Sequence, residues 1–306
     1  MSVALDASAI AAVLESELLN RWPALPSEQP IALYVEAMRA PSHAGGYRCV
    51  DAKVHSWCDG LRTRPGGAEA LEQYHRVVLA KAIEATRARL AAAELPESVR
   101  QLVDAEHGRI LRDLRLPKRN FYFHDNDAFA KDLALASLRL LPCGSELVDL
   151  ASGLPRSIAL RSGLGQGMRM VWIGLRDRGY RPWFECHWDR RLLQFFTATE
   201  YDRFYCRVAE LLERHPKAKG LMTSSWWFDP ALAAISPELA LLSATPMANG
   251  ADRLRVGAHP IATKDALRFA KERSAQHAAG RYQPCVYMLA WGRGPLITWA
   301  ERMRRA

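Results

Sequence analysis

The sequence lacks paired cysteine motifs and long apolar runs. Its six cysteines are scattered along the 306 residues: Cys49, Cys58, Cys143, Cys186, Cys206 and Cys285. This spacing indicates neither a zinc knuckle nor a disulfide framework, so we expect reduced thiols and no bound metal. No apolar stretch approaches the roughly 20 residues of a membrane span, and acids stand near the start where a signal peptide has bases. These absences predict a cytoplasmic protein without a membrane partner.

The sequence also has no run of five or more basic residues, no internal repeat and no low-complexity segment. It does have a basic surplus, because 42 Lys and Arg against 33 Asp and Glu give a formal net charge of +9. Such a surplus favours anionic partners, for example a phosphorylated cosubstrate, RNA or an acidic carrier protein. The bases are dispersed among acids, so the sequence does not define a nucleic-acid surface.

The first third of the chain has the pattern of helices. Apolar residues recur at helical spacing over residues 68–93 and again between Pro96 and Pro117. The chain is long enough for one elaborated domain or two. We therefore expect an all-helical N-terminal region over residues 1–117.

Beyond residue 117, short strand patterns alternate with helical ones. Strands are expected at residues 146–151, 183–189, 220–225 and 285–291, with helices between them, including one from Thr199 to His215. This alternation predicts an α/β (α+β) fold over residues 118–306, with a mixed sheet flanked by helices.

Residues 161–189 gather the features that suggest chemistry. Gly163, Gly165 and Gly167 precede a short amphipathic helix, and small residues there let backbone amides approach an anion at a helix N-terminus. The following strand places Glu185, His187 and Asp189 on one face. At this spacing the carboxylates bias the protonation of the imidazole and can order a water.

This turn, helix and strand resemble the acyl-CoA-binding segment of the GNAT N-acyltransferases. The resemblance covers about 30 to 45 residues and implies a GNAT-like fold in the second region. It implies that Arg161 and the amides of Gly163, Gly165 and Gly167 hold the pyrophosphate of acyl-CoA or of an acyl-phosphopantetheine. It also implies that a tyrosine protonates the departing thiolate, and Tyr205 is the candidate, although it lies later than the family pattern places it.

We therefore predict an acyltransferase that moves an acyl group from a CoA or carrier thioester to an amine. Glu185 or His187 would remove the amine proton, directly or through water. Ser224 or Ser225, on a neighbouring strand, would donate to the developing oxyanion.

Two other functions remain open at this stage. His187-Trp188-Asp189, with His259 and Arg268 downstream, has the order of a two-His-one-carboxylate iron site in oxygenases that use 2-oxoglutarate. The basic surplus also fits a non-enzymatic module that binds nucleic acid or a carrier protein.

Each site residue also has a purely structural interpretation. The glycines form an ordinary loop, Tyr205 packs in the core, and Glu185, His187 and Asp189 form a solvated strand face.

Overall fold

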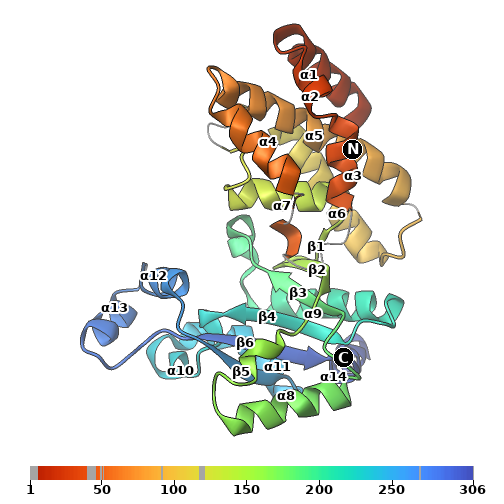
Figure 1. Ribbon diagram of the computed structural model, residues 1–306. Coiled ribbons are helices and arrows are strands. Elements are labelled where there is room, and N and C mark those ends of the chain that lie inside the picture. The colour runs from red at the N-terminus through yellow and green to blue at the C-terminus, as the bar shows by residue number, and fades with distance from the viewer. Residues whose placement is uncertain are drawn as a thin grey trace. The chain divides into compact units, whose positions relative to one another are not determined.

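A computed structural model describes residues 6–39, 46–48, 50, 52–90, 92–116, 121–268 and 270–305. Cys49 and the expected boundary at 117/118 lie outside these residues. The chain divides into two compact units, Met1–Pro142 and Cys143–Ala306 (Figure 1). None of the helices in the described part of the chain is both long and apolar enough to cross a bilayer.

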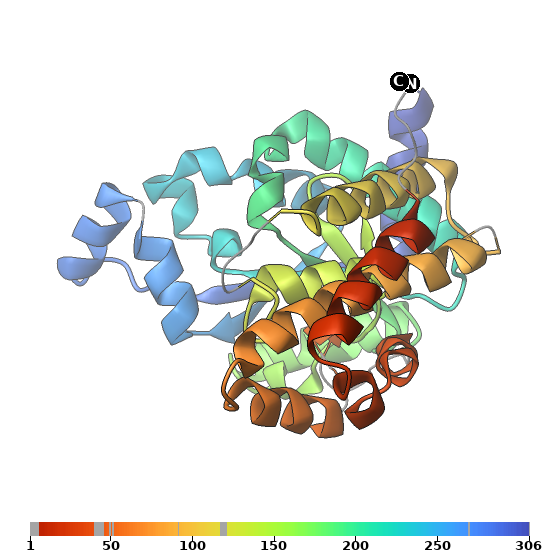
Figure 2. The same ribbon diagram turned by 90° about the horizontal axis from the view of Figure 1, so that it is seen from above.

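The first unit is helical, as expected. Its elements are α1 (Ala7–Arg21), α2 (Leu25–Glu28), α3 (Ile31–Arg39), η1 (Gly46–Arg48), α4 (Ala52–Arg62), α5 (Gly67–Leu90), α6 (Glu97–Asp113), α7 (Asp127–Ala136) and the short strand β1 (Leu140–Pro142). The long helix α5 forms the centre, because Tyr74, Val78 and Ile83 on its apolar side are fully buried. Helix α1 packs beside it (Figures 1 and 2).

Helix α7 belongs to the first unit. Its Phe129 is buried and lies against His75 of α5, with ring centroids 4.9 Å apart, and against Tyr122, with centroids 5.9 Å apart. Asn126 caps this helix by accepting from the backbone N–H groups of Ala128 and Phe129.

The second unit alternates strands and helices. Its elements are β2 (Leu147–Ser152), η2 (Arg156–Ile158), α8 (Leu164–Arg176), β3 (Trp183–His187), η3 (Arg190–Phe195), α9 (Ala198–Arg214), β4 (Gly220–Ser225), η4 (Trp226–Phe228), α10 (Leu232–Ile235), η5 (Pro237–Leu239), α11 (Leu241–Ala248), β5 (Asp252–Gly257), α12 (Pro260–Arg268), α13 (Lys271–Ala278), β6 (Val286–Gly292) and α14 (Arg293–Arg305).

The strands of this unit lie in the order β2-β3-β4-β6-β5. Strands β3 and β4 are parallel, and the β2–β3, β4–β6 and β5–β6 pairs are antiparallel. The mixed sheet flanked by helices is thus confirmed. Helix α9 is the crossover between the two parallel strands, since parallel neighbours need a long connection.

Each face of the sheet is covered by helices, as the two-residue period of the strands requires. On one face, Trp183 of β3, Met222 of β4 and Met288 of β6 are buried with Met170 and Ile173 of α8. These packed side chains fix the position of β3 and β4 on that side.

The opposite face packs against α9 and α14. There the ring centroid of Tyr205 in α9 lies 5.2 Å from that of Trp291 in β6 and 6.0 Å from that of Trp299 in α14. Both edge-to-face contacts are buried. The strands are therefore held from both sides, and their ends are well placed to carry a site.

Candidate functional site

The parallel strands β3 and β4 are paired only near their beginnings. Within the described residues their register joins Phe184 to Leu221 and Glu185 to Met222 and goes no further. The other edge of each strand stays paired, because His187 is still opposite Leu147 of β2 and β4 is paired with β6 as far as Ser225. The carboxyl-terminal halves of β3 and β4 therefore diverge. Beyond Glu185 and Met222, the described residues of the two strands are not paired with each other.

A cavity of about 500 Å³ lies at the carboxyl ends of these two strands. It is lined by Trp188, Arg190, Leu193, Phe196, Ser224, Ser225, Trp226, Trp227, Leu239, His259, Ile261, Ala262, Asp265, Arg268, Arg273 and Val286. In open α/β sheets, ligands bind outside the carboxyl ends of parallel strands. The cavity lies at this end of β3 and β4.

Aromatic rings form much of the cavity wall. Trp227 is in edge-to-face contact with Trp188, with ring centroids 5.6 Å apart, and with Phe196, at 5.3 Å. Trp226 adjoins Trp227 at 5.9 Å. Such a wall can bury the apolar part of a ligand.

Basic side chains contribute the polar part of the lining. Arg273 is 8% exposed and is fixed in place by donating to the Ala266 carbonyl (2.6 Å) and to Ser236 Oγ (2.7 Å). Its guanidinium lies over the ring of Trp226, 4.9 Å from the centroid. Together with Arg190, Arg268 and the partly balancing Asp265, it gives the cavity a surplus of positive charge.

The N-terminus of α9 follows directly after cavity-lining residues. Leu193 and Phe196 line the cavity, and Thr197 then caps the helix by accepting from the Glu200 backbone N–H at 3.3 Å. Ala198 and Thr199 in the first turn are exposed. The first amides of a helix and its dipole favour an anion at this end.

Two solved acyltransferases have a similar fold. One is a crystal structure in complex with decanoyl-CoA and teicoplanin, and the other is in complex with CoA and 10C-teicoplanin. Each matches with a TM-score of 0.51 and 16% identity, over 89% of this chain and 80% of the other. At this identity the likeness concerns the fold alone. No family model matches the chain, and no curated protein matches it by sequence.

The predicted base Glu185 lies in the middle of β3, at the last paired position before the divergence. Its side chain is largely buried and accepts a hydrogen bond from Ser152 Oγ at 2.5 Å. Burial raises the pKa of Glu185, and the hydrogen bond from Ser152 lowers it in part. His187 is the final residue of β3 on the same face of the strand. Neither is among the residues that line the cavity, which begins at Trp188 directly after the strand.

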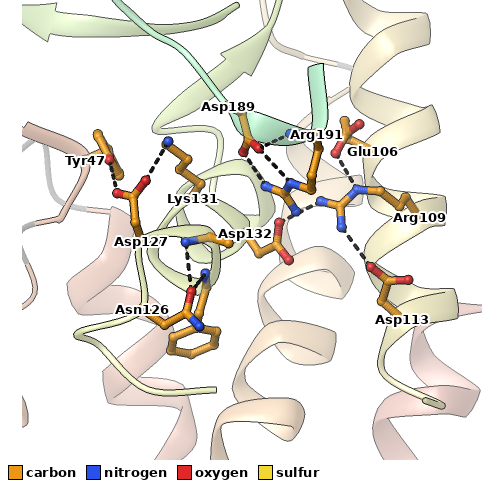
Figure 3. Close-up of polar contacts among 12 residues, drawn as sticks. Tyr47, Glu106, Arg109, Asp113, Asn126, Asp127, Lys131, Asp132, Asp189 and Arg191 are labelled. Atoms are coloured by element: carbon orange, nitrogen blue, oxygen red, sulfur yellow. Dashed lines mark hydrogen bonds and ion pairs between the residues drawn. The ribbon is translucent and has the colours of Figure 1, made fainter. Parts of the chain in front are cut away.

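Asp189 stabilises the chain at the end of β3. It is buried, and its Oδ1 accepts from the backbone N–H of Arg191 at 2.9 Å, which caps η3. Its Oδ2 is paired with Arg191 Nη2 at 2.6 Å (Figure 3). This ion pair fixes the chain where it turns from β3 toward the cavity-lining η3.

Ser224 lines the cavity, as does Ser225, so the predicted oxyanion donors lie at the divergence. Tyr205 lies in the core, and its hydroxyl donates to the Leu242 carbonyl at 3.4 Å. Burial raises the pKa of Tyr205 well above its usual value. Its assignment as the acid that protonates a thiolate stays a prediction.

The glycine-rich turn lies at the carboxyl end of β5, and its residues are not among those that line the cavity. Gly163 caps α8 with φ of 80°, and a Cβ added at Gly163 or Gly165 would meet no atom within 4 Å. Arg161 Nη1 donates to the Val256 carbonyl at 3.1 Å, and Gln166 Nε2 donates to the Arg255 carbonyl at 2.9 Å. Arg255 is opposite Tyr287 of β6, and Tyr287 is opposite Ser225 of β4, so the turn is at the end of the sheet where the cavity lies. The grouping of the glycine amides with the β3 carboxylate and imidazole stays a prediction.

The iron-site hypothesis has little geometric support. Among the described residues, the three-ligand group close enough for a metal consists of Cys58, His75 and His124, and it does not include His187, Asp189 or His259. Asp189 is already bound to Arg191.

Sequence reasoning missed most of the cavity. Trp188, Phe196 and Trp227 come from three separate segments that only the parallel crossover brings together. The available signal was the double tryptophan directly after the strand over residues 220–225, at the end where ligands bind.

Proposed function

We propose that this protein is an acyltransferase whose donor is an acyl-CoA thioester bound where β3 and β4 diverge. The observation that supports this most directly is the cavity at the carboxyl ends of these strands, with the N-terminus of α9 beside it. The fold it shares with the two solved acyltransferases supports the same reaction class.

The pantetheine arm, the phosphates and the acyl chain of an acyl-CoA each have a matching feature in the site. The amides of a pantetheine arm can pair with the backbone groups of the diverging strands, in the manner of an added strand. Phosphates are favoured by the first amides of α9 and by Arg190. An acyl chain can lie against Trp188 and Trp227.

The reaction needs a base, because an ammonium group cannot attack a carbonyl. We assign this role to Glu185, whose raised pKa makes it a better proton acceptor than an exposed carboxylate. The amine nitrogen then bonds to the thioester carbon, and Ser224 or Ser225 donates to the oxyanion. The C–S bond breaks, and CoA leaves as a thiolate that takes up a proton.

The acceptor is proposed as an amino group on a bulky glycopeptide-like molecule, since both neighbouring structures contain a teicoplanin. Their bound molecules are CoA derivatives and teicoplanins, rather than RNA or a carrier protein.

Calorimetric titration with decanoyl-CoA tests the donor site. Trp188→Ala should weaken binding by roughly tenfold or more, because one large buried contact is worth about 1.5–3 kcal/mol. The matched control is Trp172→Ala, which removes an exposed tryptophan from α8 outside the cavity and should leave the affinity unchanged. Equal affinity of both variants and the wild type would contradict the proposal.

The glycine turn with Arg161 is the second candidate for the phosphates. Its exposure and the free space around Gly163 and Gly165 are compatible with a ligand. Gly165→Val separates the two sites, because the added side chain has room in the fold but would block close approach to the turn. Unchanged decanoyl-CoA binding favours the β3–β4 site, and loss of binding favours the turn.

A further inference from the structure

A cysteine and two histidines converge inside the helical unit. Cys58 of α4 and His75 of α5 are buried, and His124 precedes α7. One potential ligand atom from each residue lies within 4.8 Å of the other two. These residues are far apart in the sequence, because His124 is 66 positions after Cys58, so no short motif reveals them.

The separations match the edges of a tetrahedral metal site. Cys58 Sγ is 3.6 Å from His75 Nε2 and 3.3 Å from His124 Nε2. A tetrahedron with Zn–S of about 2.3 Å and Zn–N of about 2.0–2.1 Å has S–N edges of about 3.5 Å. The ligand atoms of His75 and His124 lie within 4.8 Å of each other. Since the N–N edge of such a site is about 3.3 Å, a metal can bind to all three atoms after an adjustment of at most about 1.5 Å.

An oxygen atom lies near the fourth corner of the same tetrahedron. The Tyr34 hydroxyl lies 3.0 Å from His124 Nε2 and 3.4 Å from His75 Nε2. The corresponding N–O edge of a tetrahedral zinc site is about 3.4 Å. The fourth ligand position thus faces this hydroxyl.

The backbone orients His75 for this role. Its Nδ1 lies 2.7 Å from the Tyr122 carbonyl oxygen, which can only accept, so Nδ1 must carry the proton. The Nε2 lone pair is then directed toward Cys58 and His124. Metal-binding histidines are commonly oriented by such a hydrogen bond from the other ring nitrogen.

The surrounding side chains hold the group in place. The ring centroid of His75 lies 4.9 Å from that of Phe129 in α7, and that of His124 lies 4.5 Å from that of His55 in α4. One thiolate and two imidazoles form a donor set that suits zinc and disfavours magnesium or calcium.

We propose that Cys58, His75 and His124 bind a zinc ion that joins α4, α5 and the segment before α7. The metal has a structural role in the first unit. This inference is independent of the acyltransferase proposal, because it concerns different residues and a different ligand.

The test uses the full chain loaded with Zn²⁺, desalted and assayed for metal by mass spectrometry. We expect one zinc per chain. Cys58→Ala should weaken zinc binding by more than roughly tenfold in competition with a chromophoric chelator. Cys206→Ala, which removes a partly exposed thiol of α9 outside the group, should retain the wild-type affinity.

Co²⁺ on the wild-type chain gives a second readout that does not require the Cys58 variant to fold. We expect the visible bands of tetrahedral cobalt and a thiolate-to-cobalt charge-transfer band. Zinc should also slow alkylation of Cys58, followed by peptide mass spectrometry. If the desalted wild type retains no zinc and its cobalt spectrum has no thiolate band, the group is a metal-free hydrogen-bonded cluster and the proposal is wrong.

Discussion

Glu185 and Glu146 of the second unit both have a raised pKa, and we expect different consequences from each. Glu185 is at the last paired position of β3 with β4, and its carboxylate accepts from Ser152 Oγ. Glu146 is 3% exposed and accepts from the Tyr201 hydroxyl at 2.9 Å. Burial raises the pKa of both groups. The proposed role of Glu185 is catalytic, whereas the protonation of Glu146 should affect the stability of the fold.

Glu185→Gln should lower the rate of acyl transfer by roughly 100-fold or more, the usual contribution of a general base. The carboxylate form is the active base, so wild-type kcat/KM should rise with pH through the raised pKa of Glu185, and the variant should lose this rise. Decanoyl-CoA affinity, measured by calorimetry, should stay within about twofold because the amide has nearly the same shape. A variant with the wild-type rate and pH profile would exclude Glu185 as the base.

Glu146 should make the stability of the protein depend on pH. Burial raises its pKa from 4.5 to about 7, although hydrogen bonds from Tyr201 and Cys186 act in the opposite direction. The folded state therefore binds this proton more tightly than the unfolded state. Its contribution is fully present below pH 4.5 and is lost as the pH rises through about 7.

Urea unfolding of Glu146→Gln at pH 5 and pH 8 measures this contribution. Relative to the wild type, the free energy of unfolding of the variant should gain about 3 kcal/mol between the two pH values. The exposed Glu301→Gln in α14 is the control and should show no such gain. An equal pH dependence in all three proteins would mean that Glu146 is not protonated in the folded state.

At the scale of elements, the beginning of β4 depends on a close backbone approach. A Cβ at Gly220 would lie 2.7 Å from Trp183 Cζ3 and 2.9 Å from Gly292 Cα, and closer still to the Trp291 carbonyl oxygen. Gly220→Ala should therefore lower the free energy of unfolding by about 1–3 kcal/mol, measured in urea. Gly60→Ala in α4 has free space around it and should be neutral or slightly stabilising. Equal stability of the two variants would show that β4 can move away from β6 at no cost.

Single elements were predictable from the sequence because their signals are local. The apolar spacing from Thr199 to His215 predicted α9 to within two residues of its start, although Thr197 rather than Thr199 caps the helix. The predicted strand over residues 220–225 coincides with β4. The helical first region was likewise evident from the periodicity of α5. Capping and amphipathic patterns are properties of neighbouring residues.

Strand pairing was not predictable, because it depends on contacts between distant segments. Residues 161–189 contain a turn, a helix and a strand, which resemble an acyl-CoA-binding segment. The structure joins β2 and β3 as antiparallel neighbours and places the parallel crossover one helix later, at α9. The zinc-ligand candidates Cys58, His75 and His124 escaped notice for the same reason, since only the packing of α4, α5 and α7 brings them together.

At the scale of the whole molecule, each unit has a proposed ligand of its own. The first unit contains the Cys58, His75 and His124 group, and the second contains the cavity at the ends of β3 and β4. The net charge of +9 adds a general attraction for a polyanionic donor such as acyl-CoA. The β3–β4 site and the glycine turn differ in the backbone amides that a bound acyl-CoA would cover.

Hydrogen–deuterium exchange of the full chain, with and without saturating decanoyl-CoA, distinguishes these two sites most directly. We predict slower exchange in residues 188–200 and 223–228, where the ends of β3 and β4 and the first turn of α9 meet the cavity. Residues 161–168, around the glycine turn, should exchange at the same rate in both conditions. Protection confined to residues 161–168, or no protection anywhere, would contradict the proposed donor site.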